Sequence, residues 1–180
     1  MIVGFQGAPG AFSDEAARAF GAVTTHPYPT FDALCEAVAR GDVPYGVLPV
    51  ENRIVGAIGA ARAAFACAGG LRVVGSVVHR IELALVGVRG ALLDDVRCVI
   101  SHPAALAQCS GFLAALAHAC PCEFYDTAGA VRDVVARGDA SRAAIAPVRC
   151  AARYGAAVID AAVADVSENR TRFWLIAAPA

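Results

Sequence analysis

The sequence predicts an α/β fold built on a parallel or mixed sheet, and three observations support this prediction. Short apolar runs typical of buried strands alternate with alanine-rich runs of helical period along a chain of 180 residues. Ser, Thr and Gly stand at many boundaries of these runs, where helix caps and stops are expected. With 58% hydrophobic and 17% charged residues, the chain can bury a substantial core in one domain or two lobes.

The first part of the chain contains three strand and helix pairs. The expected elements are a strand at 2–6, a helix at 14–20 capped by Ser13, an extended piece at 23–28, a helix at 31–40 capped by Thr30, a strand at 45–50, a turn at 51–53 and a helix from about 56 to 68. Asp14 and Glu15 fall in the favourable first turn of their helix. Gly41 and Gly69-Gly70 end the later helices.

The second part begins with a long extended passage at 71–85, which we interpret as a crossover between lobes. After it we expect a strand at 96–100, a helix at 102–119 capped by Ser101, a strand at 122–125, a helix ending at 137 capped by Thr127, a strand at 143–146, a helix opened by Pro147 and closed at Gly155, an extended piece at 157–159 and a buried strand at 174–178. Lobe 1 is thus predicted at 1–78 plus 160–180, and lobe 2 at 79–159.

Composition excludes several classes of protein. A net charge of -1 gives no reason to expect a nucleic-acid partner or an anionic membrane surface. No run approaches the roughly 20 apolar residues of a membrane span. The chain opens on a strand without a basic region before it, so we expect no signal peptide and a cytoplasmic location.

The seven cysteines are odd in number and include no Cys-x-x-Cys, so we expect reduced thiols. His118 with Cys120 and Cys122 has no second ligand cluster to complete a metal site, so no metal is expected. No glycine-rich phosphate loop follows a strand, and no serine lies in a nucleophile elbow. Nucleotide binding and serine-hydrolase chemistry are therefore unsupported.

A cluster of polar residues directly before the last apolar run is the first candidate site. Within 167–173, Thr171 offers a hydroxyl and Arg172 a planar guanidinium. This pair suits a substrate with a carboxylate and a hydroxyl that must leave. The alternative is that 169–171 form a turn and Arg172 is a solvated charge at a strand end.

Further candidates lie at predicted strand ends, where ligands bind in α/β sheets. Ser101 and Gln108 are two helical turns apart and would share a face; Ser101 would also cap its helix, and a buried Gln108 amide needs a partner. Glu51 and Asn52 follow a strand and act either as an acid beside a substrate or as capping residues for the next helix. His102 is either an acid or base, or a structural residue.

Taken together, these stretches resemble the prephenate dehydratase family. The matching pieces, in order, are 7–13 (GAPGAFS), 49–52 (PVEN) with Gly56, 101–103 (SHP) with 105–109 (ALAQC), 126–128 (DTA), 143–146 (AAIA) with Tyr154-Gly155, and Asn169 with 171–173 (TRF). They depart from the common family pattern at Ala11, Arg53, Ala104 and Pro147. Arg53 adds a cation beside the expected site.

The resemblance implies a two-lobed fold of the type II periplasmic-binding-protein kind, with the active site in the interlobe cleft. It implies conversion of prephenate to phenylpyruvate, carbon dioxide and water without a cofactor. The catalytic residues would be Thr171, Glu51 and Asn52. The substrate-binding residues would be Ser101, Gln108, Arg172, Phe173, Asn169 and Thr127.

The resemblance leaves two alternatives open: arogenate dehydratase, and a ligand-binding module of the same fold without catalysis. The family commonly has a C-terminal regulatory domain, so a sequence ending soon after Phe173 is expected to be the catalytic domain alone. Because the family is commonly oligomeric and this chain is alanine-rich, we expect a homodimer or a larger homo-oligomer.

Overall fold

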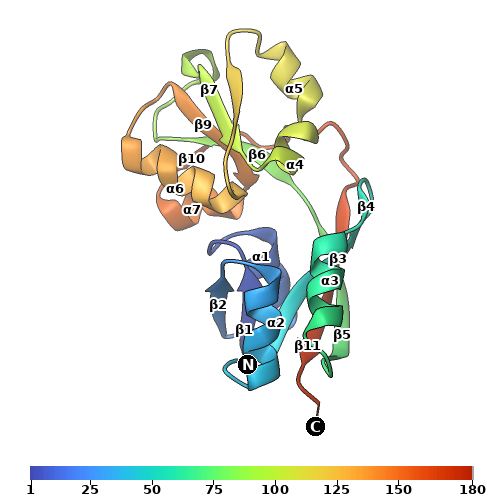
Figure 1. Cartoon of the computed structure of the whole chain (residues 1–180). Coiled ribbons are helices and arrows are strands. Elements are labelled where there is room, and N and C mark those ends of the chain that lie inside the picture. Colours follow the sequence, from blue (N-terminus) through green and yellow to red (C-terminus); the bar gives the residue numbers. More distant parts are fainter. Residues whose placement is uncertain (180) are drawn as a thin grey trace. The chain divides into compact units, whose positions relative to one another are not determined.

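The computed structural model describes residues 1–179, which divide into two compact units (Figure 1). Unit 1 comprises Met1–Ile81 and the C-terminal segment from Asn169, and unit 2 comprises Glu82–Glu168. The lobe boundaries predicted from the sequence, at 78/79 and 159/160, both lie earlier in the chain than the observed boundaries at 81/82 and 168/169. Each unit contains one mixed sheet with helices packed on it, so the predicted α/β class is confirmed.

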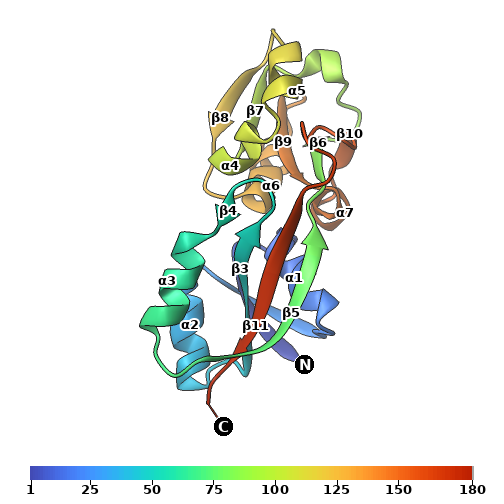
Figure 2. The same ribbon diagram turned by 90° about the vertical axis from the view of Figure 1, so that its right-hand side faces the viewer.

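The sheet of unit 1 has the C-terminal strand near one edge. Its main strands are β1 (Ile2–Gln6), β2 (Thr24–Tyr28), β3 (Tyr45–Asn52), β5 (Arg72–Arg80) and β11 (Arg170–Ala177). They lie in the order β2-β1-β3-β11-β5, and the short β4 (Gly56–Ala57) pairs with β3. β11 is antiparallel to both neighbours, β3 and β5, as Figure 2 shows. The chain end therefore returns to the first unit, as predicted.

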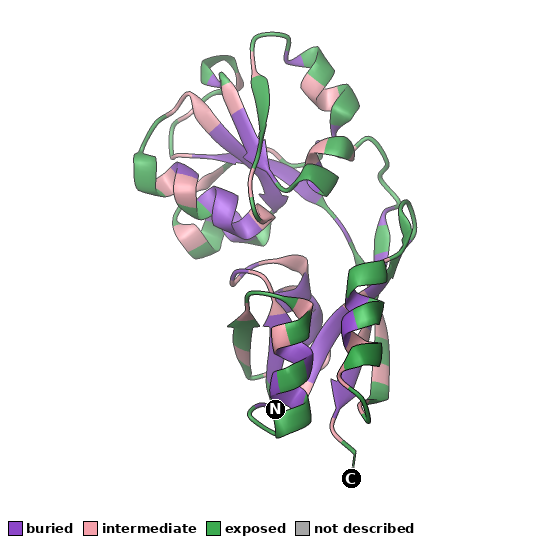
Figure 3. Cartoon of the chain, viewed as in Figure 1, coloured by how far each residue is buried: buried purple, intermediate pink, exposed green. Residues whose placement is uncertain are grey.

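Helices cover both faces of this sheet. α1 (Phe12–Ala19) packs on one face over a cluster that includes Val3, Val47 and Phe173. α2 (Phe31–Arg40) and α3 (Gly59–Cys67) pack on the other face over a cluster that includes Leu34, Leu48 and Ile176. The central strands are accordingly the most buried part of the unit (Figure 3).

The prediction for α2 is confirmed at both ends. Thr30 caps the helix, because its Oγ1 accepts from the Ala33 backbone N–H at 3.1 Å. Gly41 follows the last turn with φ 78°, a left-handed conformation that glycine adopts without strain.

The start of α1 differs from the prediction. The helix begins at Phe12, and Ser13 lies buried inside it instead of capping it. The Asp14 carboxylate accepts from the Gly10 backbone N–H at 2.8 Å. Asp14, in the first turn, thus accepts a hydrogen bond from the backbone just before the helix, and Ser13 does not provide the predicted cap.

The predicted turn at 51–53 is wrong for its first two residues. Glu51 and Asn52 extend β3, where they pair with Arg172 and Thr171 of β11. The next helix starts three residues later than about 56, because 56–57 form β4 against the end of β3. The partner strand, which is distant in sequence, therefore determines the end of β3.

Unit 2 has a second mixed sheet in the order β10-β6-β9-β7-β8. Its elements are β6 (Leu83–Gly87), the 3-10 helix η1 (Leu93–Asp95), β7 (Cys98–Ser101), α4 (Pro103–Ala107), α5 (Ser110–Ala115), β8 (Cys120–Glu123), α6 (Thr127–Arg137), β9 (Arg142–Pro147), α7 (Arg149–Tyr154) and β10 (Ala157–Asp160).

The single helix predicted at 102–119 is wrong, because two short helices, α4 and α5, replace it. Pro147 ends β9 and does not open α7. Within residues 1–179, no helix has the length and apolar character needed to cross a membrane.

Candidate active site

Three neighbouring strands of unit 1 bring together the polar residues of the candidate site. In the register of the sheet, Thr171 of β11 lies opposite Asn52 of β3 on one side and opposite His79 of β5 on the other. Residues directly opposite each other in antiparallel strands point to the same face. Asn52, Thr171 and His79 therefore form one row across the sheet, on the face that α1 covers.

Asn52 is the centre of a buried hydrogen-bond network. Its Oδ1 accepts from the backbone N–H groups of Ile54 at 2.9 Å and Val55 at 3.2 Å, which fixes the orientation of the amide. Its Nδ2 consequently donates to Asn169 Oδ1 and to Thr171 Oγ1, each at 2.8 Å. Asn52 and Thr171 are 5% exposed and Asn169 is 0% exposed. A network so well satisfied holds its members in one geometry.

This network determines what the Thr171 hydroxyl can do. A threonine hydroxyl has one hydrogen to donate and two lone pairs that accept. Because Asn52 donates to Thr171 Oγ1, one lone pair is occupied and the hydroxyl hydrogen is directed at another group. Thr171 is thus a fixed hydroxyl that can donate to a ligand oxygen.

His79 lies beside this row and is bound by a carboxylate. Its Nε2 is 2.8 Å from Oε2 of Glu15, which α1 projects over the sheet. The imidazole also contacts two aromatic rings, those of Phe12 and Phe173, each with its centroid 6.4 Å away. The ring is therefore held in place from the helix side and the sheet side.

His79 is not among the candidates selected from the sequence, and Glu15 is predicted only as a residue of the first helical turn. The sequence does not predict to which face of the sheet His79 points, because apolar pairs such as 73–74 and 77–78 occupy both faces of β5. The position of His79 at the candidate site follows only from the sheet register, which places His79 opposite Thr171.

Glu51 and Arg172 lie on the opposite face from Thr171. They are register partners, and Arg172 Nε is 3.5 Å from Glu51 Oε2, with both side chains about half exposed. Successive residues of a strand point to opposite faces, so Glu51 does not contact Thr171 from its position next to Asn52. The predicted catalytic role of Glu51 therefore involves no direct contact with Thr171. Whether Glu51 and Arg172 bind a ligand stays a prediction.

Phe173 lies in the core of unit 1. It is 1% exposed and packs among Val3, Val47 and Leu175 under α1. Its ring also meets His79 edge-on. We infer that Phe173 supports the face that carries the row, and its predicted contact with substrate is untested.

Two of the predicted substrate-binding residues lie near the end of β7, in arrangements that differ from those expected. Ser101 is the last residue of the strand, fully buried, and its hydroxyl donates to the Ile145 carbonyl at 2.6 Å. The cap of α4 is His102, whose Nδ1 accepts from the Ala104 backbone N–H at 3.2 Å. Because Ser101 belongs to β7 and α4 spans only Pro103–Ala107, the predicted shared helix face of Ser101 and Gln108 does not exist.

Thr127 is the first residue of α6 and is partly exposed. The helix is capped by Asp126, whose carboxylate accepts from the Gly129 backbone N–H. The capping role predicted for Thr127 is therefore wrong, which leaves its hydroxyl at the first turn of the helix. Contact of Thr127 with a ligand stays a prediction.

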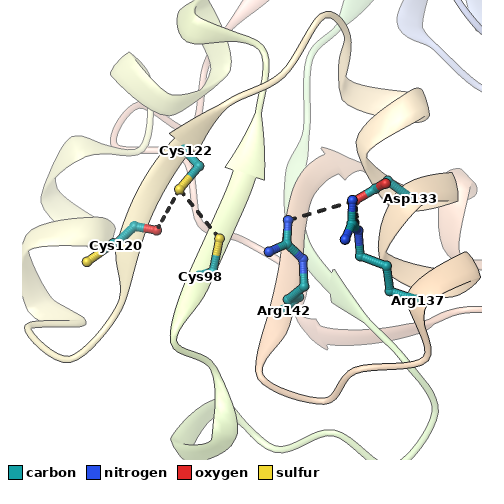
Figure 4. A network of polar contacts seen from close by, with 6 residues as sticks. All are labelled: Cys98, Cys120, Cys122, Asp133, Arg137 and Arg142. Carbon is teal, nitrogen blue, oxygen red and sulfur yellow. Dashed lines mark hydrogen bonds and ion pairs between the residues drawn. The ribbon is translucent and has the colours of Figure 1, made fainter.

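All seven cysteines are thiols, and two of them lie close together in unit 2. Cys98 Sγ is 3.5 Å from Cys122 Sγ across β7 and β8, while Asp133 pairs with Arg137 and Arg142 nearby (Figure 4). Among residues 1–179, no three His, Cys, Asp or Glu side chains gather as a metal site would require.

Burial should make two of the thiols unreactive. Desolvation raises the pKa of Cys35 to about 11 and that of Cys109 to about 12. At pH 8, we expect iodoacetamide to modify the exposed Cys67 and Cys122 while Cys35 and Cys109 stay unmodified, as mass spectrometry of peptides would show. In the urea-unfolded chain all seven thiols should react. Equal rates for Cys67 and Cys35 in the folded chain would contradict the burial of Cys35.

Several known proteins resemble this chain over nearly its whole length. The family model described as prephenate dehydratase matches residues 3–180. The bifunctional N-acyl-homoserine lactone acylase/prephenate dehydratase of Komagataeibacter europaeus is 37% identical over 97% of this chain and 62% of its own length. The Arabidopsis thaliana protein named arogenate dehydratase/prephenate dehydratase 1, chloroplastic, is 36% identical over 97% of this chain and 44% of its own length.

Solved structures show the same likeness. The prephenate dehydratase of Arthrobacter aurescens, solved in complex with L-Phe, matches with a TM-score of 0.90 and 26% identity over 100% of this chain and 61% of that chain. A putative methionine-binding lipoprotein of Bacillus subtilis shares the fold alone, with a TM-score of 0.51 and 10% identity over 99% of this chain and 83% of that chain. The chain spans 44% to 62% of the length of the two curated relatives named above. By sequence and by structure, this chain belongs to the prephenate dehydratase family.

Proposed function

We propose that the chain converts prephenate to phenylpyruvate, carbon dioxide and water, acting as a carbon–oxygen lyase in phenylalanine biosynthesis. The observation that carries this proposal is the Thr171 hydroxyl, whose oxygen is held by Asn52 at 2.8 Å so that its hydrogen can be given to a ligand oxygen. Family membership over residues 3–180 supports the choice of substrate.

The chemistry asks the protein mainly for orientation and for one proton. Prephenate is a dianion whose ring carries a carboxylate and, opposite it, a hydroxyl. Loss of both groups makes the ring aromatic, and this aromatisation drives the reaction. The departing oxygen must be protonated as its bond to the ring breaks, and a positioned donor accelerates such a step. Thr171 is the donor we assign.

The Asn52 network keeps that donor in place. Asn52 is itself held by two backbone N–H groups and by Asn169, so Thr171 needs little reorganisation when substrate arrives. Arg172, Ser101, Gln108 and Thr127 remain proposed contacts for the substrate carboxylates and ring. The carboxylate that leaves should be held loosely, because its charge disappears in the product.

Arogenate is the second candidate substrate. Several relatives that are 34% to 38% identical to this chain carry the name arogenate dehydratase, alone or together with prephenate dehydratase. Arogenate differs from prephenate in carrying an amino acid side chain where prephenate has a keto acid, so the same leaving groups meet Thr171.

The direct test is an assay of the purified chain with each substrate. We expect phenylpyruvate from prephenate, measured by its absorbance in alkali, at an undiminished rate with a chelator present. The parallel reaction with arogenate, followed as phenylalanine, compares the two substrates by kcat/KM. No product above the uncatalysed background from either substrate would favour a ligand-binding module without catalysis.

We further propose that the chain forms a homo-oligomer and works in the cytoplasm. Support for association comes from β5, an edge strand on which Val73, Val74 and Val78 are 43%, 43% and 51% exposed, since apolar edge strands pair readily with other chains. Support for the location comes from the thiols, because exposed cysteines such as Cys67, Cys120 and Cys122 stay reduced in a reducing compartment.

A further inference from the structure

The position of His79 beside Thr171 has no role in the family resemblance or in the mechanism above. We propose that His79, held by Glu15, is a positioning residue that supplies a proton to Thr171 as Thr171 gives its own proton to the departing hydroxyl. This inference rests on the proposed dehydration and adds to it the source of the proton.

The need for such a source follows from the acidity of threonine. A hydroxyl that gives up its proton unaided becomes an alkoxide, which is far too basic to persist at neutral pH. Thr171 must therefore receive a proton in the same step. Its oxygen has two lone pairs, and Asn52 occupies one of them at 2.8 Å, so the other can accept from a second donor.

The sheet register places His79 on the same face as Thr171, on the neighbouring strand. Thr171 and His79 are direct partners across β11 and β5, and the Cβ atoms of such partners lie about 4.5–5.5 Å apart on one face. Asn52 reaches Thr171 in the same way from β3. Thr171 thus has Asn52 as its register partner on β3 and His79 as its register partner on β5, both on the same face.

Glu15 determines which nitrogen of His79 can exchange a proton. Its Oε2 lies 2.8 Å from Nε2, and the two side chains are 13% and 23% exposed. A carboxylate can only accept, so Nε2 carries the hydrogen in this contact, and the contact orients the ring. Nδ1 is then the nitrogen left to donate toward Thr171.

The other charged groups nearby are directed elsewhere. On α1, Arg18 Nε is 3.3 Å from Asp14, so these two charges pair with each other. From β11, Thr171 and the apolar Phe173 face His79, whereas Arg170 and Arg172 occupy the alternate positions of the strand. The neighbouring Arg80 of β5 likewise has the opposite phase. Glu15 is the charged group that is seen to pair with the ring in the described part of the chain.

The proton and charge balance closes without another reactant. The C–O bond to the ring breaks as the oxygen takes the Thr171 proton, and Thr171 takes the Nδ1 proton of the imidazolium. The bond to the leaving carboxylate breaks at the same time, and its electron pair enters the ring. Prephenate dianion plus one proton gives phenylpyruvate anion, carbon dioxide and water, and neutral His79 regains its proton from solvent.

The test is the pH profile of kcat in the wild-type chain and in His79→Gln. Because the imidazolium is the proton donor in this proposal, wild-type kcat should fall toward alkaline pH, where the donor is lost. Glutamine keeps a polar side chain but cannot titrate, so we expect kcat about 10²-fold lower, no such fall, and KM changed less than about twofold. His26→Gln, on an exposed histidine of the same unit, is the matched control.

A second variant and a folding measurement keep the outcome clear. Trp174 is the one tryptophan of the chain and lies in unit 1, so its emission reports whether that unit is folded. If His79→Gln alters this emission, Glu15→Gln decides, and it should lower kcat with KM nearly unchanged. If the wild type is active and the folded variants keep its kcat and pH profile, the inference about His79 is wrong while the proposed function stands. A wild-type chain that makes no product overturns the proposed function together with it.

Discussion

Replacing Thr171 with valine should lower kcat for prephenate about 10²–10⁴-fold and change KM little, because general-acid groups typically contribute that much. Valine has nearly the same shape as threonine and lacks the hydroxyl, so the β-branched packing on β11 is kept. The Asn52 amide loses one acceptor at 2.8 Å, which is a modest loss of hydrogen bonding. The measurement is steady-state phenylpyruvate formation at several prephenate concentrations.

Thr171→Ser is the matched control, since it restores the hydroxyl without the methyl group. We expect it to keep kcat within about tenfold of the wild type, the remaining loss arising from the freer rotation of serine. A valine variant in which only KM rises would mean that Thr171 positions substrate without donating a proton. Serine as slow as valine would show that the methyl group, and not the hydroxyl, is what matters.

The sequence predicted the elements whose ends are local. Thr30 and Gly41 bound α2 at the predicted residues, because a cap bond and a left-handed glycine involve only neighbours in the chain. The apolar run that begins at Trp174 likewise identified the buried C-terminal strand. The family pattern selected Asn52, Asn169 and Thr171, which the structure joins in one hydrogen-bond network.

Other predictions failed where distant partners decide the structure. β3 extends through Asn52 because β11, more than a hundred residues later, pairs with it. The same register places Glu51 and Arg172 on the face opposite Thr171, which a linear motif cannot reveal. His79 joined the site only because β5 lies beside β11. In helices, Asp126 and His102 provided the caps that were assigned to Thr127 and Ser101, since each pair of neighbours offers two competing acceptors.

Asn52→Asp should destabilise unit 1 by about 3–5 kcal/mol at pH 8, because it places a carboxylate where a buried amide donated. Oδ1 would still accept from Ile54 and Val55, yet the second oxygen would face acceptors that Nδ2 now serves, the Asn169 Oδ1 and the Arg170 carbonyl, and Thr171 would have to turn its hydroxyl hydrogen toward it. With Asn52 only 5% exposed, water cannot relieve this repulsion. Urea unfolding followed by Trp174 emission measures the loss in unit 1.

The loss should depend on pH in a definite direction. Burial beside acceptors disfavours the ionised carboxylate, so the folded-state pKa of the introduced group is raised above its unfolded value of about 3.9. Below about pH 4 the group is neutral in both states and can donate its proton to one acceptor. As pH rises, ionisation favours the unfolded chain, so the deficit relative to wild type grows from pH 4 to the raised pKa and then levels off.

Gln6→Glu is the matched control, because it makes the same exchange of amide for carboxylate at a more accessible side chain on β1. We expect its unfolding midpoint to stay close to wild type at both pH 5 and pH 8. The Asn52 variant should also lose most of its activity at pH values where it is still folded, since Thr171 no longer has the donor that orients it. If this variant were as stable as Gln6→Glu at pH 8, the Asn52 amide would not be the buried centre of the network. If it were unstable but retained full kcat while folded, the network would hold unit 1 together without orienting Thr171.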